Sequence, residues 1–304
     1  MIVQKSINDG IKACFGESVT IEDEAYVGGG DINEARCLQL SNGEKIFVKY
    51  NSAVNKGFFE AEEIGINAIA ATKTIQVPKL LFRGVDKTTG KAFLAMEFIS
   101  GAGRIHDFWE TFGHSLAAMH MAETGGIVSG GKFEFDKFGF HSDNYIGATK
   151  QLNSLRNSWI EFFRDCRLEP QFKLAERYFD KTTIKNIIKL LDKLPELLIE
   201  PKQPSLLHGD LWSGNYIVGN DGKAWLIDPA VYVGHAEADL AMTELFGRFP
   251  EMFYKAYAAT NPVEPGYEDR RDLYNLYHLT NHLNLFGGAY YSAVIGTVEH
   301  YIFK

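Results

Sequence analysis

The stretch that organises this chain is Leu206-Leu207-His208-Gly209-Asp210-Leu211-Trp212-Ser213-Gly214-Asn215, followed after a short β-rich run by Trp225-Leu226-Ile227-Asp228-Pro229. An Asp five residues before an Asn, with a second Asp beyond them, is an arrangement used to transfer a phosphoryl group. Asp210 would take the proton of an acceptor hydroxyl, while Asn215 and Asp228 would supply oxygen ligands for Mg²⁺ bound to a triphosphate. In the alternative interpretation, these three residues only shape a polar loop and cap a strand.

The residues between the two motifs predict a β-hairpin. Tyr216-Ile217-Val218 and Ala224-Trp225-Leu226-Ile227 are short β-prone runs on either side of the turn Asn220-Asp221-Gly222. Such a hairpin would carry Asn215 and Asp228 to neighbouring strand ends.

The composition is that of a globular protein. With 304 residues, 45% of them hydrophobic and 23% charged, the chain can bury a large core in one compound domain or two lobes. We expect no signal peptide and no membrane span, because no sustained apolar stretch of the required kind is present. Three widely spread cysteines, Cys14, Cys37 and Cys166, indicate a reducing compartment rather than a disulfide framework or a zinc site. The sequence therefore predicts a cytoplasmic protein without a membrane partner.

The formal net charge of -8 argues against a nucleic-acid partner, whose phosphates favour a basic surface. An acidic protein can take a cationic small molecule as substrate, although an acidic surface often serves only solubility. The sequence gives no indication of the oligomeric state.

The segment from Thr20 to Tyr50 predicts a three-stranded antiparallel meander, with a hairpin turn at Asn42-Gly43. The first turn contains Gly28-Gly29-Gly30, whose backbone N–H groups could approach phosphates because no Cβ blocks them. Glycines are also ordinary hairpin residues, so this turn alone does not establish a phosphate site.

The third strand of the meander places a lysine where it needs a partner. Alternation puts Phe47 and Lys49 on one face, and an unpaired buried ammonium is costly. In the helix expected from Gly57 to Ala71, Glu62 lies about 40° from the direction of Ile66 on the apolar face. We therefore expect Glu62 to pair with Lys49 and to hold it against the phosphates, with Glu63 in reserve. Alternatively, both glutamates are solvated and Lys49 reaches the solvent.

A change of composition at Ser100-Gly101-Ala102-Gly103 predicts a hinge after two further strands, Leu80 to Val85 and Ala92 to Phe98. We place the boundary near Ile99, which gives an N-terminal lobe of residues 1–98 and a C-terminal lobe of residues 99–304, with a ligand cleft between them. Beyond the boundary, helical spacing predicts a mainly helical lobe with helices at Phe108 to Met119, Trp159 to Leu168, Ile184 to Leu198, Asp239 to Gly247, Pro250 to Ala259 and Glu268 to Phe286. Pro195 should interrupt or kink the third of these.

The order of glycine loop, strand lysine, helix glutamate, hinge, H-G-D-x-x-x-x-N and D-P resembles the bilobal, α+β protein-kinase-like fold in its aminoglycoside and choline kinase branch. In detail the chain is similar to the fructosamine kinase (ketosamine 3-kinase) family over nearly its whole length. The motifs that carry this resemblance are His208 to Asn215, Asp228-Pro229-Ala230, Gly234-His235, Asp239-Leu240-Ala241-Met242, Phe246-Gly247, Pro265-Gly266-Tyr267, Asn281 to Gly287, Phe138-Gly139-Phe140, Gly28-Gly29-Gly30, Phe47-Val48-Lys49, Phe59-Glu60 with Glu62, and Val77-Pro78.

The resemblance implies an ATP-dependent kinase that uses Mg²⁺. Carried over by position, Asp210 is the proton acceptor, Asn215 and Asp228 bind the metal, Lys49 meets the phosphates, and the backbone of Glu97-Phe98-Ile99 receives adenine. Trp212, His235 and Asn284 are candidates for the sugar side, although each could have only a structural role.

The family phosphorylates a sugar hydroxyl of glycated amines, which lets the adduct decompose and serves deglycation. The implied substrate is therefore a small glycated amine or a glycated protein lysine, and the sequence does not choose between ribulosamine, erythrulosamine and fructosamine. One departure is Asp31, which follows the three glycines where some members carry cysteine, and which could weaken ATP binding. Two alternatives stay open: a kinase of another small cation, such as an aminoglycoside or choline, and a non-catalytic nucleotide-binding protein.

Overall fold

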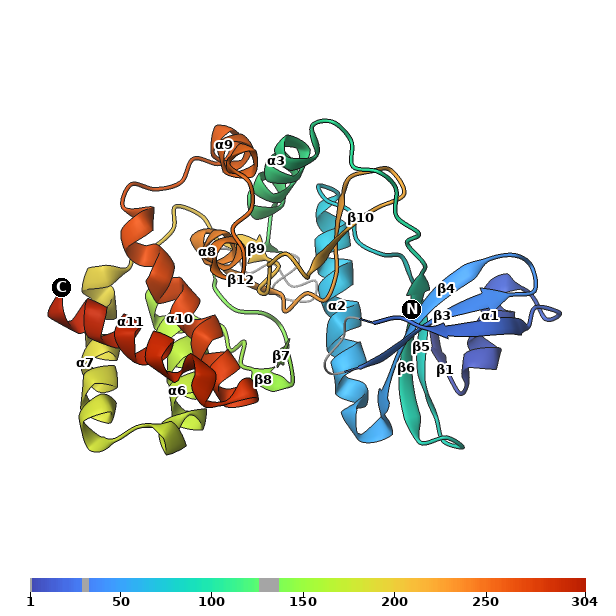
Figure 1. Cartoon of the computed structure of the whole chain (residues 1–304), viewed down its shortest axis with the longest axis horizontal. Coiled ribbons are helices and arrows are strands. Elements are labelled where there is room, and N and C mark those ends of the chain that lie inside the picture. Colours follow the sequence, from blue (N-terminus) through green and yellow to red (C-terminus); the bar gives the residue numbers. More distant parts are fainter. Residues whose placement is uncertain (1, 29–32, 126–136) are drawn as a thin grey trace.

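The computed structural model describes residues 2–28, 33–125 and 137–304, and it places a sheet-containing N-terminal part beside a mainly helical C-terminal part (Figure 1). The N-terminal part is built on one six-stranded sheet with the strand order β1-β5-β6-β4-β3-β2. Its strands are β1 (Ile2–Gln4), β2 (Ile21–Tyr26), β3 (Glu34–Leu40), β4 (Lys45–Ser52), β5 (Leu80–Asp86) and β6 (Lys91–Glu97). The predicted meander is thus the β2-β3-β4 half of a larger sheet, and only β1, which pairs in parallel with β5, was not expected.

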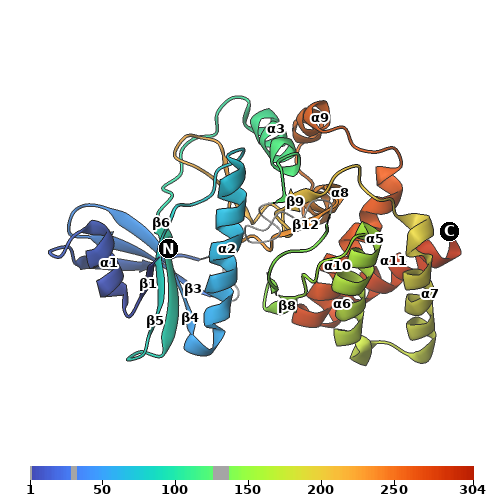
Figure 2. The same ribbon diagram turned by 180° about the vertical axis from the view of Figure 1, so that it is seen from behind.

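The sheet lies between two helices, α1 (Ile7–Phe15) on one face and α2 (Lys56–Thr72) on the other (Figures 1 and 2). In β4, Val48 packs in the cluster that contains Ile11 of α1, whereas Phe47 packs with Phe59 of α2. Because strand side chains alternate between faces, Lys49 shares the α2 face with Phe47. This confirms the alternation that the sequence predicts for the strand.

The C-terminal part consists mainly of helices. They are α3 (Phe108–His120), α5 (Trp159–Phe163), α6 (Glu169–Leu174), α7 (Lys181–Leu197), α8 (Glu237–Leu245), α9 (Glu251–Thr260), α10 (Tyr267–Phe286) and α11 (Tyr291–Phe303), with short 3₁₀ turns at Glu176–Tyr178 and Gly288–Tyr290. These elements confirm the α+β class. None of the helices in the described ranges is both long enough and apolar enough to cross a membrane.

Three helical details differ from the prediction. The helix expected from Trp159 to Leu168 is α5 followed by a π-helical turn (Arg164–Leu168) that leads into α6. Pro195 does not interrupt α7, because it lies in the last turn and the helix ends two residues later, at Leu197. Helices α1, α6 and α11 were not predicted at all.

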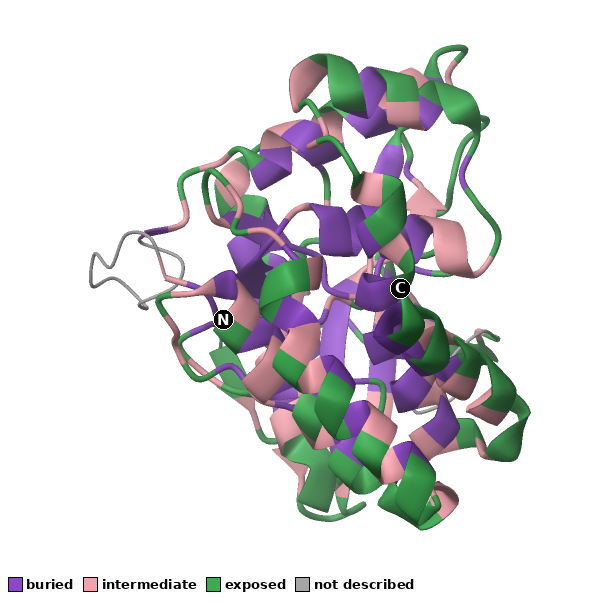
Figure 3. Cartoon of the chain, turned by 90° about the vertical axis from the view of Figure 1, so that its left-hand side faces the viewer, coloured by how far each residue is buried: buried purple, intermediate pink, exposed green. Residues whose placement is uncertain are grey.

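Three short antiparallel strand pairs connect the helices. They are β7 (Asn144–Ile146) with β8 (Thr149–Gln151), β9 (Ser205–Leu207) with β12 (Tyr232–Gly234), and β10 (Tyr216–Val218) with β11 (Ala224–Leu226). The β10–β11 pair is the hairpin that the sequence predicts. Around the pairs, the helices turn buried residues inward and exposed residues outward, so one continuous apolar core supports the segments between β9 and β12 (Figure 3).

Candidate active site

A buried carboxylate fixes the loop that follows β9. Asp239, 1% exposed on α8, accepts hydrogen bonds from the backbone N–H groups of His208 at 2.6 Å and Gly209 at 2.8 Å. Its Oδ2 also lies 3.2 Å from Nε2 of His120. Burial alone would raise the pKa of Asp239, but the hydrogen bonds from His120 and Gly209 hold it below its ordinary value. A charged Asp239 therefore anchors the start of the loop. The sequence marked Asp239 only as part of a family motif; an acid among the apolar residues of α8 was the available signal.

His208 and Gly209 join this loop to the segment after β11. Nδ1 of His208 accepts from the N–H of Asp210 at 3.3 Å, and its Nε2 lies 2.9 Å from the carbonyl oxygen of Ile227. Burial lowers the pKa of His208, so the ring is neutral and Nε2–H donates. Gly209 has a φ of 81°, and a Cβ there would collide with the carbonyl oxygen of Ala230. The close approach of these two segments therefore requires glycine at this position.

Asp210 is held by Asn215. The side-chain amide of Asn215 donates to the carbonyl oxygen of Asp210 at 2.7 Å and to its Oδ2 at 3.0 Å. Burial raises the pKa of Asp210 to about 7; the Asn215 hydrogen bond opposes this shift, while Asp228 and Asp239 add to it. A carboxylate with a pKa near neutrality is suited to accept a proton from a reacting hydroxyl.

His278 of α10 is a neighbour of Asp210 that sequence reasoning did not identify. Its Nδ1 lies 3.9 Å from Oδ1 of Asp210. Burial lowers the pKa of His278 to about 3, so the ring is neutral and the two side chains form no ion pair. His278 therefore contributes shape and polarity beside Asp210 rather than charge.

The predicted pair between Lys49 and Glu62 is present. Nζ of Lys49 donates to Oε1 of Glu62 at 2.7 Å, and it also donates to Oδ1 of Asp228, a contact that the sequence did not predict. Burial alone would lower the pKa of Lys49, but Asp228 and Glu62 raise it, so the ammonium stays charged. The reserve candidate Glu63 pairs instead with Arg83. Lys49 thus links the sheet, α2 and the segment that carries Asp228.

Asn215 and Asp228 lie at neighbouring strand ends, as the hairpin prediction requires, because the N–H of Ile227 donates to the carbonyl oxygen of Asn215 at 3.0 Å. The amide of Asn215 donates twice to Asp210, which leaves its Oδ1 as an acceptor, and the side chain of Asp228 is 46% exposed. These hard oxygens fit Mg²⁺, which takes one or two protein ligands and completes its shell with phosphates and water. Among the described residues, no cluster of three or more His, Cys, Asp or Glu forms a separate metal site.

Buried amides hold the segment after Asp228. Nδ2 of Asn144 donates to the carbonyl oxygen of Val231 at 2.7 Å, and Nε2 of Gln151 donates to that of Ala230 at 3.0 Å. The hydroxyl of Tyr277 donates to Oε1 of Gln151 at 2.7 Å. Because these side chains are buried and satisfied, they fix the backbone that positions Asp228.

The predicted adenine and phosphate residues are only partly described. Gly28 follows β2 in open surroundings, whereas Gly29, Gly30 and the neighbouring Asp31 lie outside the described residues. Glu97 ends β6, where its N–H donates to the carbonyl oxygen of Lys79 at 2.9 Å. Phe98 and Ile99 follow as half-buried residues of the connection to α3.

Trp212 lies on the surface of the loop that follows β9. Its side chain is 36% exposed, and its ring packs edge-on against Phe246 with centroids 6.1 Å apart. Phe246 in turn packs on His282 at 4.7 Å. These three residues form an aromatic wall that begins two positions after Asp210. Phe246 and His282 were noted in the sequence only as family motif residues.

The other two sugar-side candidates lie elsewhere. His235 is 4% exposed and packs in the core between Trp159 and Tyr274, with ring centroids 6.3 and 5.9 Å away. Asn284, near the end of α10, donates through Nδ2 to the carbonyl oxygen of Gln171 at 3.0 Å and to its Oε1 at 2.8 Å. The structure therefore does not bring His235 to a ligand-accessible surface, and it holds Asn284 against Gln171 of α6.

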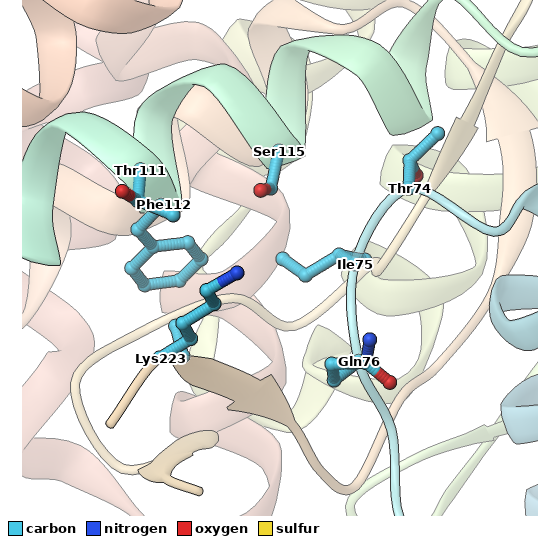
Figure 4. A pocket seen from close by; sticks show the side chains of 8 residues that line it. Thr74, Ile75, Gln76, Thr111, Phe112, Ser115 and Lys223 are labelled. Carbon is cyan, nitrogen blue, oxygen red and sulfur yellow. The ribbon is translucent and has the colours of Figure 1, made fainter. Parts of the chain in front are cut away.

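A small cavity of about 80 Å³ lies between α3, the segment after α2 and β11 (Figure 4). It is lined by Thr74, Ile75, Gln76, Thr111, Phe112, Ser115, Lys223 and Ala224, none of which is a predicted site residue.

The geometry can be compared with known proteins. Residues 3–304 match the family model described as fructosamine kinase. A protein-ribulosamine 3-kinase of Arabidopsis thaliana is 41% identical over 295 residues, covering 94% of this chain and 85% of the relative. A fructosamine-3-kinase candidate from Haemophilus somnus has a crystal structure that matches with a TM-score of 0.85 at 28% identity, covering 97% and 96% of the two chains.

A spectinomycin phosphotransferase in complex with ADP and spectinomycin matches at 14% identity with a TM-score of 0.55, covering 97% and 93% of the two chains, and it shares the fold alone. The family model spans almost the whole sequence, and Lys49 contacts Asp228 while Asn215 contacts Asp210 in the structure. This chain belongs to the fructosamine kinase family.

Proposed function

We propose that this protein transfers the γ-phosphoryl group of ATP to a sugar hydroxyl of a ketosamine, carried on a small amine or on a protein lysine. The observation that carries the proposal is the contact of Lys49 with both Glu62 and Asp228, next to the loop on which Asn215 holds Asp210. The name of the Arabidopsis relative supports a ribulosamine as substrate and the hydroxyl of the third sugar carbon as acceptor. Phosphorylation there would let the adduct decompose, which is a deglycation role.

In the proposed reaction, Asp210 accepts the proton of the acceptor hydroxyl while the oxygen of that hydroxyl bonds to the γ-phosphorus. The bond from that phosphorus to the bridging oxygen breaks, and ADP leaves. Lys49, held by Glu62, binds the phosphates, and Asn215 and Asp228 hold the metal. Bound Mg²⁺ would neutralise charge on the phosphate oxygens. The buried surroundings that raise the pKa of Asp210 are consistent with its role as base.

The remaining assignments follow from the sequence pattern and from the resemblance to the family. The backbones of Gly28, Gly29 and Gly30 would approach the phosphates, and those of Glu97, Phe98 and Ile99 would receive adenine. Residues 1–98 and 99–304 would act as two lobes around the nucleotide. Trp212 would contribute the aromatic wall of the sugar site, because it is exposed beside Asp210. We place the protein in the cytoplasm, since its three cysteines are odd in number and widely spread.

The test compares four acceptors with MgATP under one condition, reading the release of ADP. Ribulosyl-lysine and fructosyl-lysine should be phosphorylated. Choline should be a poor acceptor, because it lacks the sugar hydroxyls and would leave the polar groups of the pocket unpaired. Kanamycin has hydroxyls, but it should also be a poor acceptor, because its larger ring system needs an extended acidic platform. Turnover of kanamycin or choline with none on the glycated lysines would replace the proposal by another small-molecule kinase. ATP binding without turnover of any of the four would favour a non-catalytic nucleotide-binding protein.

A further inference from the structure

A hollow of about 360 Å³ lies in the C-terminal part between β8, the end of α6 and the C-terminal turn of α10. Figures 1 and 2 both place β8 beside the end of α10, on the side that faces α2. The residues that line the hollow are Thr149, Lys150, Leu174, Arg177, Asn284 and Leu285. It is therefore apolar along its sides and carries two cations.

The two cations differ in their partners. Lys150 is 64% exposed and pairs with Asp143 at 3.0 Å. Nη2 of Arg177 makes long hydrogen bonds to the hydroxyl of Tyr178 and to the carbonyl oxygen of Asn284, each 3.3 Å, and no described carboxylate pairs with Arg177. In a protein with a net charge of -8, a guanidinium that lines an apolar hollow and has no carboxylate partner among the described residues is suited to bind an anionic ligand.

The hollow lies within reach of Asp210. Helix α10 carries His278, whose Nδ1 is 3.9 Å from Asp210, and Asn284 six positions further on. Six residues of α-helix rise about 9 Å. On the other side, Gln151 ends β8 directly after Lys150 and donates to the carbonyl oxygen of Ala230. Along the axis of α10, the hollow thus lies about 9 Å beyond His278, the neighbour of Asp210.

A glycated lysine has the corresponding length and chemistry. From the third sugar carbon to the α-carboxylate carbon of lysine there are nine bonds, and bonds of about 1.5 Å at angles of about 111° advance roughly 1.2 Å each, or about 11 Å in all. The methylene chain would lie along the sides formed by Leu174 and Leu285. A phosphate on the sugar itself would stay within a few bonds of the acceptor carbon, so it could not extend to Arg177.

We propose that this hollow binds the amine-borne carboxylate of free glycated lysine, with Arg177 as the main anion-binding residue and Lys150 in support. The inference rests on the proposed function, since it assigns the distal half of the same substrate. The guanidinium of Arg177 would donate two hydrogen bonds to the carboxylate oxygens. The protein would then favour ketosamines of free lysine over ketosamines of amines that lack a carboxylate.

The experiment compares ribulosyl-lysine with ribulosyl-cadaverine, which has the same chain without the carboxylate, and measures kcat and KM for each from ADP release. We expect the KM of wild-type protein to be about tenfold lower for ribulosyl-lysine, with similar kcat values, because the anion contact lies far from the reacting atoms. Arg177→Gln should bring the ratio of the KM for ribulosyl-cadaverine to the KM for ribulosyl-lysine close to one. Arg177→Lys retains the positive charge but lacks the two parallel N–H donors of a guanidinium, so it should give an intermediate ratio. Lys150→Gln should reduce the ratio only about twofold, since its ammonium is exposed.

The matched control is Lys173→Gln, which removes an exposed cation of α6 that does not line the hollow, and which should keep the wild-type ratio. Each variant is compared by thermal unfolding, and each ratio is internal to one protein, so a partial loss of folded enzyme does not change it. Equal KM values in the wild type, or a wild-type ratio in Arg177→Gln, would overturn the subsite while leaving the kinase proposal intact. Failure to phosphorylate either compound would overturn the proposed function itself, and the subsite with it.

Discussion

Replacement of Asp239 by asparagine should displace the loop that follows β9 and so reduce turnover, without altering a residue predicted to contact a substrate. In the native protein, the carboxylate accepts from the N–H groups of His208 and Gly209 and lies 3.2 Å from Nε2 of His120. An asparagine keeps one oxygen but presents an amide donor to the remaining N–H donors. At least one buried donor is then left without an acceptor, and the start of the loop must shift.

The magnitude follows from these contacts. Hydrogen bonds to a charged group contribute about 1.5–3 kcal/mol each, and breaking a buried charged interaction costs about 3–5 kcal/mol, so we expect a loss of about 4 kcal/mol in the free energy of unfolding. For a chain of this length, an unfolding entropy of about 2.1 cal/mol/K per residue converts that loss into a decrease in Tm of about 6 °C. A displacement of Asp210 by about 1 Å should reduce kcat about 100-fold.

The assay combines ADP release with ribulosyl-lysine and a thermal unfolding curve followed by circular dichroism. The matched control is Asp272→Asn, which makes the same chemical change at an acid whose side chain is 54% exposed on α10. It should change the free energy of unfolding by less than about 0.5 kcal/mol and leave kcat near that of the wild type. If Asp239→Asn behaves like this control in both measurements, Asp239 does not anchor the loop.

Three further changes give separate expectations. Gly209→Ala should lower kcat at least about 100-fold, because the new Cβ collides with the carbonyl oxygen of Ala230 and displaces the loop that follows β9. Normal turnover by the variant would contradict the close approach of Gly209 to Ala230. Gln151→Leu should raise the Mg²⁺ concentration for half-maximal activity about tenfold, because it removes the hydrogen-bond donor to Ala230 and the acceptor of Tyr277. An unchanged Mg²⁺ titration would show that the amide of Gln151 does not support the segment that carries Asp228. His235→Asn should change the pH dependence of stability. The pKa of His235 is about 3 in the folded protein and near 6.5 in the unfolded chain. The free energy of unfolding of the wild type therefore decreases as the pH falls through that window, by about 2 kcal/mol at pH 5. Denaturant unfolding at pH 7 and pH 5 should show this loss in the wild type relative to the variant, and parallel pH dependences would contradict it.

The parts of the site that the sequence predicted are those set by local periodicity. The two-residue period of β4 placed Lys49 with Phe47, and the helical period of α2 placed Glu62 toward the sheet, so their contact followed from short stretches of chain. The hairpin between Asn215 and Asp228 was predictable for the same reason, because its turn residues have strong local preferences.

The parts that were not predicted depend on distant contacts. The contact between Lys49 and Asp228 joins residues 179 positions apart, and no periodicity reports such a distance. Strand β1 has only three residues and exists because β5 accepts it in parallel pairing. Helix α11 is rich in β-branched residues, which disfavour helix, and it is stabilised by burial of Val294 and Val298 in the core. His235 stands in a motif that suggests a site, yet packing in the core decides its place.

The central claim is that Asp210 is the base of a ketosamine kinase, and the most direct measurement is the rate of ADP formation with ribulosyl-lysine and MgATP by the wild type and by Asp210→Asn. The substitution removes the proton acceptor but leaves Lys49, Asn215 and Asp228 in place, so kcat should fall by about 10²–10⁴-fold while calorimetric titration gives nearly unchanged MgATP binding. As a comparison, Asp228→Ala should weaken Mg²⁺-dependent nucleotide binding as well as turnover. Near-normal turnover by Asp210→Asn, or no turnover of ribulosyl-lysine by the wild type, would contradict the claim.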